Sequence, residues 1–197
     1  MDNKSHPTPC ILLSLDPSST VTGWAALSFG GRLLEGGLLK PNKKGIEPAA
    51  RIDQMCKDLL VLLNEVSPSE VVLEWPSGHT GRRHHGHGSG LSTYGIAVGA
   101  IWRTCVGWAT DRHVSVHLVS ENLWTAGQSK TRRAAGVRLF YEQYNPDKDP
   151  GLDLADAIGL ALYFLGFRRH GLWVGTPDLV RQGQITMEAM NDDKGCL

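Results

Sequence analysis

The amino-acid sequence predicts an α/β fold in which a five-stranded mixed β-sheet is flanked by α-helices. The chain has 197 residues, of which 41% are hydrophobic. This length and composition suit one domain of roughly 100–200 residues with a buried core. Short apolar runs typical of strands alternate with longer segments whose apolar residues recur at helical spacing. Three strand-like segments come first and helices alternate with strands after them, which favours a mixed sheet with helices on its faces.

The first half of the chain contains three expected strands and one expected helix. Residues 11–15 form an apolar run that ends at Asp16-Pro17, which predicts a buried strand with a sharp exit. Residues 21–29 and 32–40 flank Gly30-Gly31, a pair typical of a two-residue hairpin turn. Residues 47–66 then place apolar side chains at helical spacing, and Pro68 ends this predicted helix.

The second half alternates helices with strands. Three apolar residues precede Glu74 and predict a fourth short strand, which ends before Pro76. We then expect a loop rich in Gly, His and Arg, a helix, a fifth strand and two further helices, over residues 77–89, 91–109, 114–119, 130–144 and 152–167.

Residues 11–167 are predicted to form the domain, with a flexible N-terminus at residues 1–10 and a C-terminal extension at residues 168–197. The first ten residues lack the apolar stretch of a secretory signal, and no run of about 18 apolar residues predicts a membrane span. The four cysteines lie far apart without a Cys-x-x-Cys motif, a pattern typical of reduced thiols. We therefore expect a cytoplasmic protein without a membrane partner.

The charges are unevenly distributed, although 20 basic and 20 acidic residues cancel to a formal net charge of zero. Residues 79–138 contain eight Lys and Arg but two acids, a balance of +6, which leaves −6 for the rest of the chain. A nucleic-acid partner responds to a local basic patch rather than to the total charge. We expect the loop and the basic helix to contact nucleic-acid phosphates, and the alternative is that both are merely solvated. The candidate DNA-binding residues are Arg82, Arg83, His84, His85, Lys130, Arg132 and Arg133.

Four acidic residues border apolar segments, where an uncompensated charge is costly. Asp16 and Glu74 end two predicted strands, and Asp153 and Asp156 share one face at the start of a predicted helix. Taken singly, Asp153 suits helix capping and Asp16 suits turn chemistry. Taken together, four converging carboxylates need cations, and hard oxygen ligands select Mg²⁺ or Mn²⁺. We expect two such ions, which can activate a water and stabilise a leaving oxygen in phosphodiester cleavage.

Four motifs occur in the order and spacing of the RuvC family of Holliday-junction resolvases, which the chain therefore resembles. They are the strand and turn of residues 11–24, the Val71–Glu74 strand, the Gly-rich helix at residues 95–100, and the Asp-x-x-Asp-Ala sequence at residues 153–157. The resemblance implies an RNase H-like fold in which the first and fourth strands are neighbours. It also implies metal-dependent catalysis by Asp16, Glu74, Asp153 and Asp156.

The family resemblance further implies a homodimer that resolves four-way DNA junctions by paired symmetric cuts, in a bacterial cell or a virus-infected bacterial cell. The chain departs from the family in its loop, where Trp75 follows Glu74 directly and the usual aromatic a few residues on is missing. Two alternatives therefore remain open. One is an RNase H-fold nuclease acting on flaps, forks or hybrids, and the other is a non-cleaving nucleic-acid-binding module.

Overall fold

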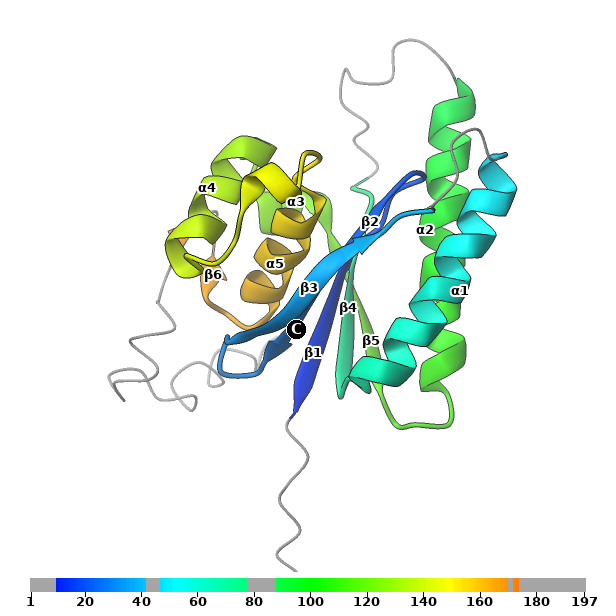
Figure 1. Cartoon of the computed structure of the whole chain (residues 1–197), viewed down its shortest axis with the longest axis horizontal. Helices are drawn as coiled ribbons and strands as arrows, with labels where there is room; N and C mark the ends of the chain where they lie inside the picture. The colour runs from blue at the N-terminus through cyan, green and yellow to red at the C-terminus, as the bar shows by residue number, and fades with distance from the viewer. Residues whose placement is uncertain (1–9, 42–46, 78–87, 170–171, 174–197) are drawn as a thin grey trace, which may run out of the picture.

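Five strands form one mixed sheet in the order β3-β2-β1-β4-β5 (Figure 1). The computed structural model describes residues 10–41, 47–77, 88–169 and 172–173. Strand β1 is antiparallel to β2 and parallel to β4, so the predicted mixed sheet and the adjacency of the first and fourth strands are confirmed. The strands are β1 (Ile11–Asp16), β2 (Thr22–Ser28), β3 (Leu33–Leu39), β4 (Glu70–Trp75) and β5 (Ser115–Ser120).

Helices cover both faces of this sheet (Figure 1). Helices α1 (Pro48–Val66) and α2 (Gly88–Ala109) lie on one face, and α3 (Glu121–Thr125), α4 (Lys130–Phe140) and α5 (Asp153–Phe164) lie on the other. Side chains alternate between the faces along a strand. Leu13 and Leu15 of β1 accordingly pack in one apolar cluster with α1 and α2, whereas Leu12 packs in a second cluster with α4 and α5.

The turn between β2 and β3 is one residue longer than the sequence predicted. Ser28 N–H donates to the carbonyl of Arg32 at 2.9 Å, and Gly31 N–H donates to the carbonyl of Ser28 at 2.8 Å, which leaves a three-residue loop. Gly31 has a φ of 79°, the left-handed conformation that the last residue of such a loop adopts and that glycine tolerates best.

Two predicted helices are shorter in the structure. Helix α4 ends at Phe140 instead of residue 144, because Tyr141 is extended (φ −132°) and its hydroxyl donates to the carbonyl of Gly31 across the domain. Helix α5 spans residues 153–164 instead of 152–167, since Leu152 is left-handed (φ 57°) and Gly166 lies beyond the last turn with a φ of 83°. The short helix α3 was not predicted.

The described part of the predicted C-terminal extension contains two short antiparallel strands, β6 (Arg168–Arg169) and β7 (Leu172–Trp173). Arg168 is fully buried, so ordered packing continues past the predicted boundary at residue 167. Residues 1–9 and 174–197 lie outside the described residues, and the flexible terminus and the extension stay predictions. Among the helices described, none combines the length and the apolar character that crossing a bilayer requires.

Candidate active site

Asp16 and Glu74 lie side by side because two neighbouring strands run parallel and end together. Leu15 of β1 pairs with Leu73 of β4, so the next residue of each strand is an acid at the same edge of the sheet. Both acids are buried, each with 7% of its surface exposed. Ser14, two residues before Asp16, donates its hydroxyl to the carbonyl of Ala157 in α5 at 2.7 Å. The alternation of side chains therefore turns Asp16 towards the start of α5.

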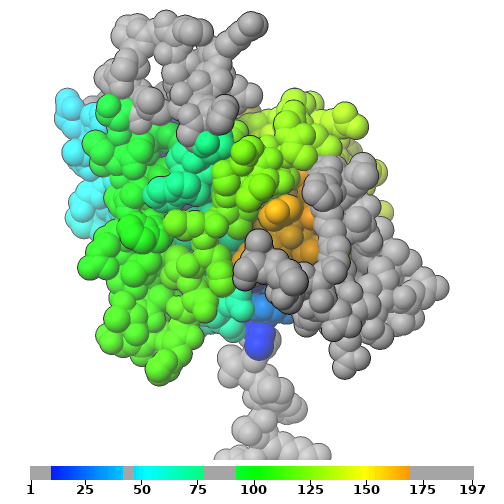
Figure 2. Space-filling model, turned by 180° about the vertical axis from the view of Figure 1, so that it is seen from behind, coloured from blue at the N-terminus to red at the C-terminus, as the bar shows by residue number. Residues whose placement is uncertain are grey.

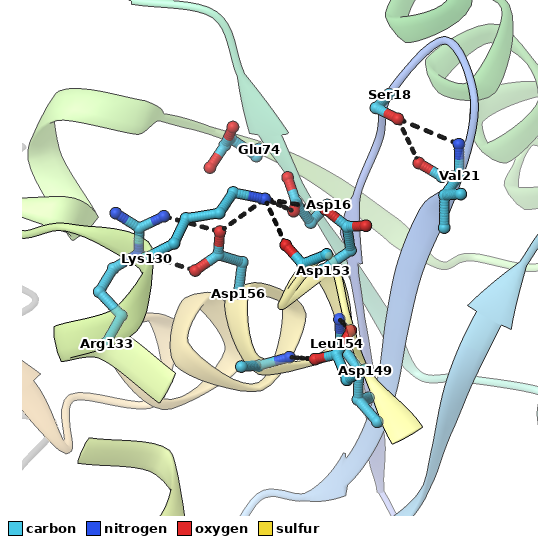
Figure 3. Close-up of polar contacts among 12 residues, drawn as sticks. Asp16, Ser18, Val21, Glu74, Lys130, Arg133, Asp149, Asp153, Leu154 and Asp156 are labelled. Carbon is cyan, nitrogen blue, oxygen red and sulfur yellow. Dashed lines mark hydrogen bonds and ion pairs between the residues drawn. The ribbon is translucent and has the colours of Figure 1, made fainter. Parts of the chain in front are cut away.

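The first turn of α5 brings the other two acids to this edge (Figure 3). Asp156 is 1% exposed, and the Asp153 side chain is 19% exposed. Buried Asp149 stabilises this end of the helix, because its carboxylate accepts hydrogen bonds from the backbone N–H groups of Leu154 at 3.3 Å and Ala155 at 2.9 Å. Helix N-termini carry unpaired N–H groups, so this contact fixes where the turn begins.

A glycine permits the close approach of α5 to β2. Gly23 pairs with Asp16 across the β1–β2 ladder, and a Cβ at Gly23 would overlap the backbone carbonyl of Asp153. Any side chain at this position would push the first turn of α5 away from the sheet. Gly23 therefore sets the separation between Asp16 on the strand and Asp153 on the helix.

The ammonium group of Lys130 lies among three of the four carboxylates (Figure 3). Its Nζ is 2.8 Å from Asp153 Oδ1, 3.2 Å from Asp156 Oδ2 and 3.8 Å from Asp16 Oδ2. Lys130 is the first residue of α4, whose N-terminus is capped by Ser129. Lys130 was predicted as a DNA contact, and the structure places it inside the acidic cluster.

Arg133 lies one turn further along α4 and also pairs with an acid. Its Nε and a terminal nitrogen donate to the two carboxylate oxygens of Asp156 at 2.7 and 2.6 Å. The guanidinium group lies 4.9 Å from the ring centre of Trp124, and Arg133 is 6% exposed. Arg133 was expected on a DNA-facing surface, but its buried contacts make it a partner of Asp156. Arg132, which lies between Lys130 and Arg133 in the sequence, is exposed.

Burial and repulsion raise the pKa values of two of the acids. The pKa of Asp16 lies well above its usual range, because the side chain is buried and the charges of Glu74 and Asp156 repel its ionised form, which Lys130 offsets in part. The pKa of Glu74 is raised from 4.5 to about 7 by burial and by the charge of Glu121, against the hydrogen bond from Trp124.

The arrangement suits a divalent cation, which would favour the ionised form of all four acids. Burial lowers the pKa of Lys130, but Asp16 and Asp156 outweigh that effect and raise it, so its amine stays protonated. When all four carboxylates are ionised, their charge exceeds that of this ammonium and the Arg133 guanidinium by two, and a cation would compensate that excess. Carboxylate oxygens are the ligands that Mg²⁺ and Mn²⁺ prefer. Within the described residues no three acids, His or Cys lie as a ready-made metal-binding group, and the Lys130 ammonium lies among three of the carboxylates.

The structure describes one of the two predicted DNA-binding segments but not the other. Lys130, Arg132 and Arg133 lie on α4 beside the acids, whereas Arg82, Arg83, His84 and His85 lie outside the described residues. Two residues of the site were missed at the level of sequence: Trp124 and Asp149. Each acts through a contact with a residue more than four positions away, which no local motif signals. Gly23 lies within the motif of residues 11–24, but its contact with Asp153 was not predicted.

Comparisons with known proteins find similarity to Holliday-junction resolvases in sequence and in fold. The crossover junction endodeoxyribonuclease RuvC of Synechocystis is 24% identical over 166 residues, which cover 81% of this chain and 93% of the relative. RuvC of T. thermophilus in complex with a Holliday-junction substrate matches with a TM-score of 0.56 and 22% identity, over 78% of this chain and 90% of that chain.

The yeast mitochondrial Holliday-junction resolvase matches with a TM-score of 0.52 and 12% identity, over 82% of this chain and 80% of that chain. No protein-family model matches the chain. The structural likenesses confirm the RNase H-like fold, and the RuvC relative supports the resemblance that the four motifs indicated.

Proposed function

We propose that this chain, which shares the fold of the RuvC resolvases, is a metal-dependent endodeoxyribonuclease that resolves four-way DNA junctions. The observation that carries the proposal is the convergence of Asp16, Glu74, Asp153 and Asp156 at one sheet edge, in a fold similar to that of a junction-bound RuvC. The RuvC relative of similar length supports the same activity.

In this mechanism the four acids would hold Mg²⁺ or Mn²⁺, with two ions at each site. Ions held there would supply an activated water and would stabilise the leaving oxygen of the phosphodiester. Arg133 keeps both oxygens of Asp156 fixed through its paired hydrogen bonds. Lys130 exchanges its carboxylate contacts for the phosphate that is cut, where its charge stabilises the transition state.

DNA recognition would use the basic segment and would depend mainly on shape and phosphates. Exposed Arg132 lies on the same helix as Lys130, so α4 can present one positive charge outwards and one to the reacting phosphate. We assign phosphate contacts to Arg82, Arg83, His84 and His85 from the sequence pattern alone.

Paired cuts need two active sites, so the proposed enzyme is a homodimer. Residues of α2 and β5, in green, cover a large part of the face shown in Figure 2. On α2, a Cβ at Gly95 or Gly99 would meet no atom within 4 Å, and Ile96 between them is 64% exposed. Small residues beside an exposed apolar one favour close approach of a second copy, so we place the dimer contact there.

Incubating the purified protein with labelled four-way, forked and linear DNA tests the function. We expect symmetric nicks in the four-way substrate with Mg²⁺ or Mn²⁺ and no cleavage with EDTA. Cleavage of forks or flaps instead would favour a different RNase H-fold nuclease, and binding without cleavage would favour a non-cleaving module.

Asp16→Asn provides the matching inactive variant. It is expected to bind the four-way junction as tightly as the original protein, because removing a negative charge does not weaken attraction to phosphates, but to leave the DNA uncut. Asp53→Asn on the exposed side of α1 is the control and should cleave normally. An Asp16→Asn protein that still cuts would exclude this acid from the site.

A further inference from the structure

The indole of Trp124 is fully buried beside the acidic cluster. Its Nε1–H donates a hydrogen bond of 2.7 Å to Glu74 Oε2, which joins α3 to the end of β4. This contact is short and lies out of water, so it constrains the carboxylate more strongly than an exposed hydrogen bond would. Glu74 otherwise faces the repulsion of neighbouring acids.

The ring of Trp124 is itself held on several sides. The guanidinium groups of Arg133 and Arg168 lie 4.9 and 5.5 Å from the ring centre. A Cβ at Gly159 of α5 would come within 3.0 Å of the ring atom Cζ3, so α5 packs on the indole without a side chain between them. The ring cannot slide without displacing a buried arginine or α5.

We propose that Trp124 is a positioning residue that holds the Glu74 carboxylate where it binds the divalent cation. The inference rests on the proposed function, and it assigns to Trp124 the role of orienting the Glu74 carboxylate rather than of contacting DNA. Partners that orient a metal-binding side chain typically change metal affinity or activity by about 10–100-fold when they are removed.

Trp124→Phe removes the N–H donor and keeps an apolar ring. Trp108→Phe is a matched control, because Trp108 is also buried and its Nε1–H donates to Asn64 Oδ1 at 2.9 Å, in the apolar cluster on the other face of the sheet. Both variants lose one indole hydrogen bond to a side-chain oxygen, but only one of these bonds reaches a candidate metal ligand.

Thermal unfolding without DNA, followed while Mg²⁺ is titrated, measures metal binding independently of cleavage. We expect the half-saturating Mg²⁺ concentration to rise about tenfold in Trp124→Phe and to change by less than about twofold in Trp108→Phe. Equal half-saturating Mg²⁺ concentrations in the two variants would overturn the proposal. An original protein whose unfolding temperature does not change with Mg²⁺ would overturn it as well.

Junction cleavage gives a second readout. The rate of Trp124→Phe should fall about tenfold at low Mg²⁺ and recover at high Mg²⁺, with the KM for junction DNA unchanged. An original protein that cuts no DNA would refute the proposed function alone, since the Mg²⁺ titration needs no substrate.

If circular dichroism shows that Trp124→Phe is unfolded, Gly159→Ala tests the same contact. The added Cβ displaces the ring, while alanine is a better helix former than glycine at this position. An unchanged half-saturating Mg²⁺ concentration in Gly159→Ala would then count against the proposal.

Discussion

Glu74→Gln is expected to stabilise the metal-free protein at pH 8 while it abolishes cleavage. Burial and Glu121 raise the pKa of Glu74 from 4.5 to about 7. In the unfolded chain this carboxyl loses its proton near pH 4.5, so its ionisation destabilises the fold progressively as the pH rises from there through 7. Glutamine has no charge to bury, and its side-chain oxygen can still accept the hydrogen bond from Trp124.

The size of the effect follows from the pKa shift. Raising the pKa from 4.5 to about 7 corresponds to about 3–4 kcal/mol. For a chain of about 200 residues, each kcal/mol moves the unfolding temperature by about 2–4 °C, which gives a rise of about 6–16 °C for Glu74→Gln at pH 8. At pH 5 the folded state keeps Glu74 protonated, and most of that rise should disappear.

Thermal unfolding in EDTA at pH 5 and pH 8 is the assay. Glu65→Gln, an exposed position on α1, is the control and should shift stability by less than about 0.5 kcal/mol at either pH. A Glu74→Gln protein that is no more stable than the original at pH 8 would refute the reasoning. An equal gain at both pH values would also refute it, because the gain would not come from ionisation.

Three further substitutions test the geometry of the site. Lys130→Gln removes the cation among three carboxylates, so the unfolding temperature of the metal-free protein should fall at pH 8. The Mg²⁺ concentration for half-maximal stabilisation should also fall, and an unchanged Mg²⁺ titration would contradict this. Gly23→Ala should cost about 1–3 kcal/mol and abolish cleavage because its Cβ meets α5, whereas Gly30→Ala, with no contact closer than 3.8 Å, should cleave normally. Asp149→Ala should lower the free energy of unfolding by about 1–3 kcal/mol in a denaturant titration, because two N–H groups of α5 and the Tyr144 hydroxyl lose their acceptor. A decrease below about 0.5 kcal/mol would argue against its capping role.

The sequence predicted the sheet well because its strands are short, apolar and bounded by strong breakers. Asp16-Pro17 and Pro76 mark strand exits, and both strands end where expected to within one residue. These breakers are local in the chain, so a single sequence contains them. The positions of Asp16 and Glu74 at strand ends are local too, but the pairing of β1 with β4 that brings the two acids together was implied only by the family resemblance.

The features that the sequence did not predict depend on contacts between distant segments. Helix α4 ends early because the Tyr141 hydroxyl reaches Gly31, 110 residues away. The sequence pattern indicated that Arg133 and Lys130 belong to a basic surface. In the structure, the buried carboxylate of Asp156 on α5 pairs with both side chains and holds them inwards. Trp124 lies in the apolar core, and nothing in its neighbourhood along the chain signals the hydrogen bond to Glu74.

The close contact between Gly23 and the start of α5 has a consequence for synthesis of the protein. During translation, β1 and β4 with Asp16 and Glu74 leave the ribosome well before Asp153 and Asp156 do. A nascent chain therefore carries half of its acidic centre until the segment containing α5 emerges and docks on β2. Under the proposed function, competence for cleavage would therefore arise only when α5 has docked, so that an unfinished chain would not cut DNA.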